Sequence, residues 1–238
     1  MTVLRILHLY PAELGINGDA GNVLALAERA RWRGIDVDVV AHAVGDDLPA
    51  SADIVHIGSG PLSAQRAVHD DVLRIASRLR DWRDAGVPFL AIAGGWQLLG
   101  AELETPEGEV LAGAAVFPTR AALGSARHVG EIVVRLADGS TIAGFENHSA
   151  RTVLDGAEPL GRVVSGIGNG DQTEGVVVGS SIGTHLHGPI LPMNPALADR
   201  LLGTALRGEP APVPQTERVD RYATNARRAI ADRLNVSL

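Results

Sequence analysis

The amino-terminal half of the chain alternates short apolar runs with longer segments of helical periodicity, and this alternation limits the fold more than any other feature. Strands are predicted at residues 3–7, 35–40, 53–57 and 89–93, with one helix after the first run and another over 65–84. Strand–helix alternation at this spacing requires crossover connections, so the strands run parallel. The sequence therefore predicts an α/β protein with a mostly parallel central sheet flanked by helices.

The first predicted helix follows a glycine-rich stretch, Asn17-Gly18-Asp19-Ala20-Gly21-Asn22. Asp19 or Asn22 is expected to cap this helix, and Gly34 fits the position just after its end. The free N–H groups of such an entry can bind an anion. The signal is weak here, because the stretch lacks both the Gly-x-Gly-x-x-Gly spacing and the lysine of a P-loop.

The second half of the chain has a different character from residue 108 onward. Short β-rich pieces at 131–136 and 175–178 are expected to extend the same sheet or to lie against it. Residues 1–207 are predicted to form one domain. Residues 208–238 are predicted to hold a proline-rich linker and a C-terminal helix over 218–234, with an apolar stripe formed by Tyr222, Ala226, Ile230 and Leu234. Packing of this helix on its own domain is favoured over docking to a partner.

Composition excludes several classes of protein. The 238 residues include 21 basic and 28 acidic side chains, for a net charge of −7, and no basic block, which argues against nucleic-acid binding. The absence of cysteine excludes disulfides, thiolate metal sites and a cysteine nucleophile. No apolar run reaches the roughly 20 residues of a membrane span, and the amino terminus lacks the pattern of a signal peptide. A soluble, cytoplasmic protein is expected.

The segment over 88–100, Pro-Phe-Leu-Ala-Ile-Ala-Gly-Gly-Trp-Gln-Leu-Leu-Gly, carries the most information about function. It predicts a strand, a tight turn and a helix, which is the architecture of a nucleophile elbow. Glycines after the apex allow the sharp bend and leave backbone N–H groups free to face a developing oxyanion. The apex should be Ser or Cys, and here it is Ala93. Close packing of a strand on a helix, without any ligand, explains the glycines equally well.

Two further segments are rich in polar side chains. In Gly183-Thr184-His185-Leu186-His187-Gly188-Pro189, His187 is expected where a strand ends, a position that suits a general base. Two histidines at i and i+2 could also hold a metal, but no carboxylate follows closely, so no metal site is expected. The segment over 144–152, Gly-Phe-Glu-Asn-His-Ser-Ala-Arg-Thr, is expected either to contribute to a site or to form a solvated loop.

Taken in order, these segments resemble one family. The chain resembles the class I glutamine amidotransferase-like family, and within it the GatD-type glutaminase subunits of lipid II isoglutaminyl synthase, which are grouped with cobyric acid synthase-type amidotransferase domains. Each motif alone is weak, but their joint order over residues 7–199 is specific. The segments that carry the resemblance are Leu9-Tyr10-Pro11, Gly18-Asp19-Ala20-Gly21-Asn22, Arg31-Trp32-Arg33-Gly34, Gly144-Phe145-Glu146-Asn147-His148, Thr173-Glu174-Gly175 and Leu186-His187-Gly188-Pro189.

The resemblance implies a flavodoxin-like fold and a mechanism. In this family a cysteine at the elbow attacks the side-chain amide of glutamine, and a histidine takes the thiol proton and then protonates the departing ammonia. Carried over by position, Ala93 replaces the cysteine and His187 is the histidine. The oxyanion hole is expected at the N–H of Gly94, with a second donor from the turn that contains Ser59 and Gly60.

The resemblance also implies a substrate site and a partner. Arg127 is expected to hold the α-carboxylate of L-glutamine through its bidentate geometry, and Gln97 is a second expected substrate-binding residue. In this family ammonia passes to a MurT-like Mur-ligase subunit, which holds ATP and activates the D-glutamate carboxylate of lipid II. No cofactor is expected in the chain itself.

Several positions depart from the family pattern. The family motif Cys-Gly-Gly-Tyr-Gln is here Ala-Gly-Gly-Trp-Gln over 93–97, and a Gly-Gly-Gly-Gln-Asp turn is Gly-Ser-Gly-Pro-Leu over 58–62. Pro61 has no N–H to donate, His185 stands where a tyrosine is expected, and no Glu stands two residues after His187. The Cys–His pair of this family then acts without a third, acidic residue, or the partner supplies that residue.

Two origins of Ala93 remain open. It is either an engineered change made to trap glutamine, or a natural loss in a paralogue, which the other altered pocket positions favour. Both predict negligible glutaminase activity. The functional alternatives are a GatD-like subunit for peptidoglycan amidation, a non-hydrolytic scaffold for a ligase that uses free ammonia or another amine, and a domain serving cobalamin synthesis. The last normally needs a fused synthetase domain, which the sequence lacks.

Overall fold

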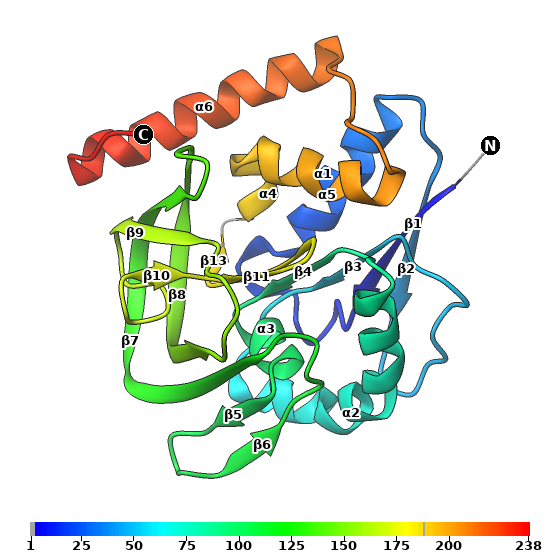
Figure 1. Ribbon diagram of the computed structural model, residues 1–238, viewed down its shortest axis with the longest axis vertical. Helices are drawn as coiled ribbons and strands as arrows, with labels where there is room; N and C mark the ends of the chain where they lie inside the picture. The colour runs from blue at the N-terminus through cyan, green and yellow to red at the C-terminus, as the bar shows by residue number, and fades with distance from the viewer. Residues whose placement is uncertain (1–2, 188) are drawn as a thin grey trace.

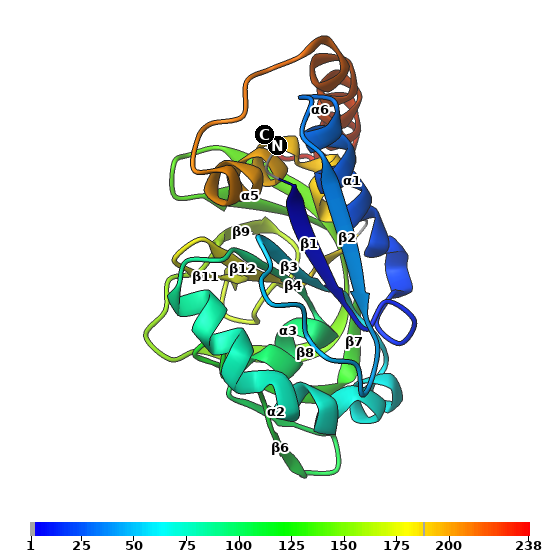
Figure 2. The same cartoon turned by 90° about the vertical axis from the view of Figure 1, so that its right-hand side faces the viewer.

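The computed structural model describes residues 3–187 and 189–238, and it contains two β-sheets packed among helices (Figures 1 and 2). The helices are η1 Ile16–Gly18, α1 Ala20–Arg31, α2 Leu62–Asp84, α3 Gly94–Leu99, α4 Ile190–Met193, α5 Pro195–Leu206 and α6 Pro214–Leu234. The strands are β1 Leu4–Leu9, β2 Val37–His42, β3 Ile54–Ile57, β4 Phe89–Ile92, β5 Glu102–Glu104, β6 Val110–Ala112, β7 Thr119–Leu136, β8 Thr141–Leu154, β9 Gly161–Ser165, β10 Thr173–Glu174, β11 Val176–Val178, β12 Ser181–Thr184 and β13 Leu186–His187.

The central sheet has the strand order β11-β12-β4-β3-β1-β2. Every neighbouring pair is parallel except β11 and β12, which are antiparallel. The predicted mostly parallel sheet is therefore confirmed, with its first four strands within a few residues of their expected positions. The β3 and β4 strands, central in the sheet, are buried along their whole length, as strands covered on both faces must be.

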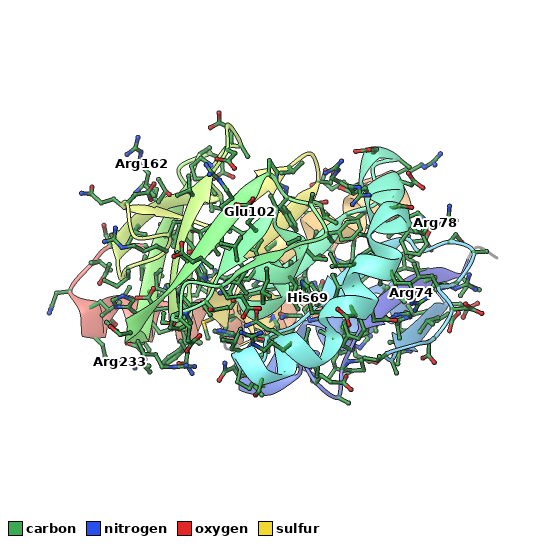
Figure 3. All side chains as sticks on the ribbon, turned by 90° about the horizontal axis from the view of Figure 1, so that it is seen from below. His69, Arg74, Arg78, Glu102, Arg162 and Arg233 are labelled. Atoms are coloured by element: carbon green, nitrogen blue, oxygen red, sulfur yellow. The ribbon has the colours of Figure 1, made fainter. Side chains whose placement is uncertain are left out.

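Helices cover both faces of this sheet. Apolar residues of α1, α4 and α5 pack on one face in a core that includes Ile6, Ile54 and Leu90. Those of α2 and α3 pack on the other face, as Figure 2 shows. The outer side of α2 is polar, and its exposed Arg74 and Arg78 (Figure 3) donate to the carbonyl oxygens of Asp46 and Ala50 in the loop after β2. Among the described residues, no helix is both long and apolar enough to cross a membrane.

The second sheet is built on the long antiparallel hairpin of β7 and β8. Strands β5, β6, β9 and β10 extend it beside β7, and β13 pairs with β8. The β-rich second half thus does both things expected of it, because β11 and β12 join the central sheet. The expectation of a solvated loop over 144–152 is wrong: the segment lies within β8, and its Glu146 and His148 are buried.

The C-terminal helix α6 crosses the β7–β8 hairpin at its turn end (Figure 1). Ile230 packs against Val133 and Ala143 of the hairpin. The predicted apolar stripe is only partly correct, because Tyr222 and Ala226 are exposed and only Ile230 and Leu234 take part in this contact. Polar contacts complete the attachment: Arg227 donates to the Met193 carbonyl oxygen at 2.8 Å.

A buried arginine joins three helices. Arg29 of α1 is 4% exposed and pairs with Asp199 of α5 at 2.5 Å and with Asp220 of α6 at 2.6 Å. Two carboxylates around one guanidinium satisfy most of its donors, which a charge removed from water requires. One side chain of α1 therefore contributes to the attachment of both α5 and α6.

Candidate active site

The elbow is present at the end of β4. Ala93 has φ 38° and ψ −103°, a conformation that residues with a side chain rarely adopt, and α3 begins at the next residue. A Cβ atom on Gly95 would lie 2.3 Å from the carbonyl oxygen of Gly58, so the close approach of the β3 turn requires glycine there. The chain thus has a strained apex of the kind that aims a nucleophile, and the side chain at this apex is a methyl group.

A small cavity of about 200 Å³ opens beside this apex. It brings together six of the seven site residues expected from the sequence: Ser59, Gly60, Ala93, Gly94, Gln97 and Arg127. His187 is not among the lining residues. It is 1% exposed, and its Nε2 is buried and without a hydrogen-bond partner within the described residues.

An acidic partner of His187 lies within the chain itself. The Nδ1 atom of His187 is 3.1 Å from Oδ1 of Asp19, and both side chains are buried. The other carboxylate oxygen of Asp19 accepts the N–H of Ser59 at 3.0 Å. A carboxylate on Nδ1 fixes the ring and leaves Nε2 as the free ring nitrogen, which is the arrangement of a general base held by a positioning residue.

Sequence reasoning missed this role of Asp19. Asp19 was expected as a helix cap, and it does occupy the N-cap position of α1, but its side chain makes no capping hydrogen bond. Asn22 does not cap either, since its Oδ1 accepts the N–H of Leu191. The signal that could have indicated it is that Asp19 lies in one of the family-like motifs, which a capping role alone does not explain.

The expected oxyanion donor is already engaged. The N–H of Gly94 donates to Oγ of Ser59 at 3.2 Å, and Ser59 is 5% exposed. The backbone of Ser59 is held on both sides, because its N–H donates to Asp19 and its carbonyl oxygen accepts the N–H of Ile16 at 3.2 Å. The Ser59 hydroxyl therefore sits where a carbonyl oxygen would have to approach Gly94.

Polar groups on the cavity wall remain free. The Oε1 atoms of Gln65 and Gln97 are buried and have no partner within the described residues, although both side chains line the cavity. At the exposed mouth, Nε of Arg127 donates to Oδ1 of Asn147 at 2.6 Å. The cavity thus offers buried acceptors in its wall and a cation at its entrance.

Two of the altered family positions lie behind the cavity rather than in it. Trp96 and His185 are buried and pack together, with ring centroids 4.8 Å apart, and neither lines the cavity. A Cβ on Gly183 would lie 2.6 Å from the Trp96 ring, so glycine makes room for the indole. The expectation that Trp96 and His185 are altered positions of the pocket is therefore wrong, because these two side chains pack against each other in the core and do not line the cavity.

Buried acids surround this unit. Glu174 accepts hydrogen bonds from the Thr184 hydroxyl at 2.5 Å and from the N–H of His185 at 2.9 Å. Burial raises the pKa of Glu174 to about 7, against the opposing effect of these donors. Glu146 differs: two backbone N–H groups and His148 lower the pKa of its carboxyl, although burial opposes them.

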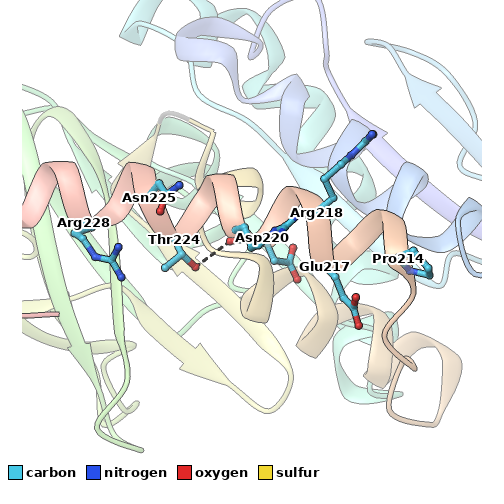
Figure 4. A pocket seen from close by; sticks show the side chains of 8 residues that line it. Pro214, Glu217, Arg218, Asp220, Thr224, Asn225 and Arg228 are labelled. Atoms are coloured by element: carbon cyan, nitrogen blue, oxygen red, sulfur yellow. Dashed lines mark hydrogen bonds between the residues drawn. The ribbon is translucent and has the colours of Figure 1, made fainter.

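Neither the histidines nor the surface hollows suggest a different site. The ring of His185 stacks on that of His148, with centroids 4.0 Å apart. The described residues hold no cluster of three or more side chains suited to a metal. A larger hollow of about 700 Å³ lies along α6 (Figure 4). All its lining residues belong to that one helix, so it is the flank of a helix rather than a cleft.

The geometry points to amidotransferases, and comparison with known proteins decides the family. The model of the CobB/CobQ-like glutamine amidotransferase domain matches residues 5–195. The chain belongs to this family.

Relatives in this family extend over nearly the whole chain. The chain is 34% identical over 238 residues to lipid II isoglutaminyl synthase (glutamine-hydrolyzing) subunit GatD of Staphylococcus aureus, covering 99% of this chain and 98% of the relative. It is 36% identical over 210 residues to the GatD subunit of Streptococcus pneumoniae, covering 86% of this chain and 81% of the relative. The resemblance found in the sequence motifs is thereby confirmed.

Solved structures confirm the fold class. A crystal structure of a glutamine amidotransferase superposes with a TM-score of 0.58 at 17% identity, covering 84% of this chain and 98% of the other. The structure of PurLQS from Thermotoga maritima gives a TM-score of 0.55 at 16% identity, covering 86% and 98%. Both are similar to this amidotransferase-family chain in fold.

Proposed function

We propose that this chain is a GatD-like subunit that docks on a MurT-like ligase for amidation of the D-glutamate of lipid II. We further propose that, with alanine at position 93, it does not hydrolyse glutamine. The two GatD relatives support the pathway and the subunit role. The observation that carries the loss of hydrolysis is Ala93, whose methyl group stands at the strained apex of the elbow. A methyl group cannot attack an amide carbon, so no γ-glutamyl thioester can form.

The rest of the machinery argues for descent from an active amidotransferase. The Asp19–His187 pair supports a base near the apex, and Arg127 at the cavity mouth supports binding of the α-carboxylate of glutamine. In the active reaction the base would take the nucleophile's proton and return it to the departing ammonia. With Ala93, these groups have no proton to move.

A second candidate function is a natural non-hydrolytic scaffold for a ligase that uses free ammonia or another amine. The contact that favours it is the hydrogen bond from Gly94 to Ser59, since an engineered change of one cysteine would leave the remaining pocket competent. Pro61, which lacks an N–H, lies in the same cavity wall and supports the same reading.

A glutaminase assay tests the proposal. Purified chain, alone and with a MurT-like ligase, is expected to release no glutamate from L-glutamine above the buffer rate. Association with the ligase is expected to persist, and amidation by the complex should depend on added ammonium salt. Glutamate release at a rate proportional to the chain's concentration would overturn the claim of inactivity, and failure to bind a MurT-like ligase would overturn the subunit role.

A further inference from the structure

We infer that Ser59 is a second, independent block on amide hydrolysis: its hydroxyl occupies the Gly94 N–H that an amide oxygen would need. This inference deepens the proposed function, on which it rests. It assigns Ser59 as a residue that determines reactivity whatever side chain stands at position 93.

The direction of the hydrogen bond carries the first step. The Gly94 nitrogen can only donate, and the acceptor 3.2 Å away is Ser59 Oγ. When a nucleophile attacks an amide, negative charge develops on the carbonyl oxygen, and backbone donors next to the nucleophile stabilise it. A donor already bound to a hydroxyl has to exchange that partner before it can receive the substrate oxygen.

The rigidity of Ser59 carries the second step. Its N–H donates to Asp19 Oδ2 at 3.0 Å, its carbonyl oxygen accepts from Ile16, and the side chain is 5% exposed. Asp19 is itself held on His187. Because the backbone is fixed at both ends, the hydroxyl cannot leave the site by a movement of the turn.

The third step is that this contact does not depend on residue 93. The bond joins the backbone of Gly94 to the side chain of residue 59, and Ala93 takes no part in it. Restoring a thiol at position 93 therefore leaves the donor engaged. Competition for one neutral hydrogen bond is expected to slow acyl transfer by about tenfold, and full loss of an oxyanion donor costs roughly 100- to 1,000-fold.

The first experiment observes Gly94 directly in the chain as it exists. In isotope-labelled protein, Ser59→Ala is expected to shift the Gly94 amide resonance and to speed its hydrogen exchange about tenfold, since one stabilising bond is lost. Ser63→Ala, at an exposed serine a few residues away in α2, is the matched control and should change neither. Ser59→Gly serves as the second variant if the alanine variant folds poorly. An unchanged Gly94 amide in a folded Ser59 variant would overturn the inference.

The second experiment measures chemistry in an Ala93→Cys background. Adding Ser59→Ala is expected to raise glutamate release from L-glutamine at least tenfold, while alkylation of the new thiol by iodoacetamide, which needs no oxyanion hole, changes less than twofold. Equal glutamate release by the single and double variants would overturn the inference. Glutamate release by the unmodified chain would instead contradict the proposed function, and the Gly94 measurement would still decide the role of Ser59.

Discussion

His187 and Asp19 form a buried pair across 168 positions of sequence, with Nδ1 and Oδ1 3.1 Å apart. The same carboxylate also accepts the N–H of Ser59. One side chain therefore joins the start of α1, the turn after β3 and the end of β13, which are the three segments that surround the elbow. This arrangement supplies from within the chain an acid that the motifs had left to the partner or to no residue at all.

Asp19→Ala is expected to destabilise the fold by about 1–3 kcal/mol, because it leaves the buried N–H of Ser59 without an acceptor and removes the partner of His187. Urea unfolding of the variant measures this loss. Asp47→Ala, at an exposed carboxylate, is the control and should stay within about 0.5 kcal/mol of the parent. A loss no larger than the control's would mean that the Asp19 contacts contribute nothing to stability.

Arg29→Ala is expected to cost about 1.5–3 kcal/mol, since it removes the charge-assisted hydrogen bonds between a buried guanidinium and two partly exposed carboxylates. The effect should be largest on α6, which Arg29 holds through Asp220, so hydrogen exchange in α6 should rise most. Arg31 of the same helix is exposed and pairs with Glu28 at 2.8 Å, and Arg31→Ala should cost less than about 0.5 kcal/mol. Similar losses for the two variants would refute the assigned role of Arg29.

Glu174 predicts a decline in stability as pH rises. Burial raises its pKa from 4.5 to about 7. Between these values the unfolded chain loses the proton while the folded chain keeps it, so stability is complete below pH 4.5 and falls by roughly 3 kcal/mol towards pH 7. His148, Glu146 and His185 face the same carboxyl and are present in both proteins that the experiment compares.

The comparison uses Glu174→Gln, which keeps an acceptor for Thr184 and His185. The difference in free energy of unfolding between parent and variant isolates the titration of Glu174. As pH rises from 4.5 to 7, the free energy of unfolding of the parent should fall relative to that of the variant. A difference that stays constant over this range would show that the pKa of Glu174 is not raised in the folded protein.

The sequence predicted the central sheet well because each of its first strands and helices has a hydrophobic pattern that can be recognised within one segment of the chain. It failed for β8, where Glu146 and His148 are polar yet buried, because their burial depends on contacts with β13 and with the loop after β9. The site residues were predicted from the order of the family-like motifs along the chain, because hydrophobic periodicity within one segment does not indicate which residues form a site. The role of Asp19 was not predicted, because its partner His187 is 168 positions away and nothing near Asp19 in the sequence indicates this contact.

Gly95→Ala tests whether the elbow needs the close approach of the β3 turn. The added Cβ would lie 2.3 Å from a backbone oxygen that cannot rotate away, so a loss of about 3 kcal/mol or more is expected. Gly130 has open space around its Cβ position, and Gly130→Ala should be nearly neutral. Thermal or urea unfolding of both variants gives the contrast, and equal effects would show that the turn relaxes freely.

Ala93 itself offers a test of strain that is independent of any activity. Its φ of 38° costs a residue with a side chain about 1–3 kcal/mol, whereas glycine adopts this region without that cost. Ala93→Gly relieves the strain but loses a buried methyl group and adds freedom to the unfolded chain. Ala91→Gly, in the buried strand β4 that precedes the elbow, suffers both losses without the relief. Ala93→Gly should therefore lower the free energy of unfolding by at least about 1 kcal/mol less than Ala91→Gly does. Urea unfolding measures the difference, and equal losses would mean that the apex stores no strain. A confirmed difference would show that the chain maintains the strained backbone geometry of an elbow around an alanine.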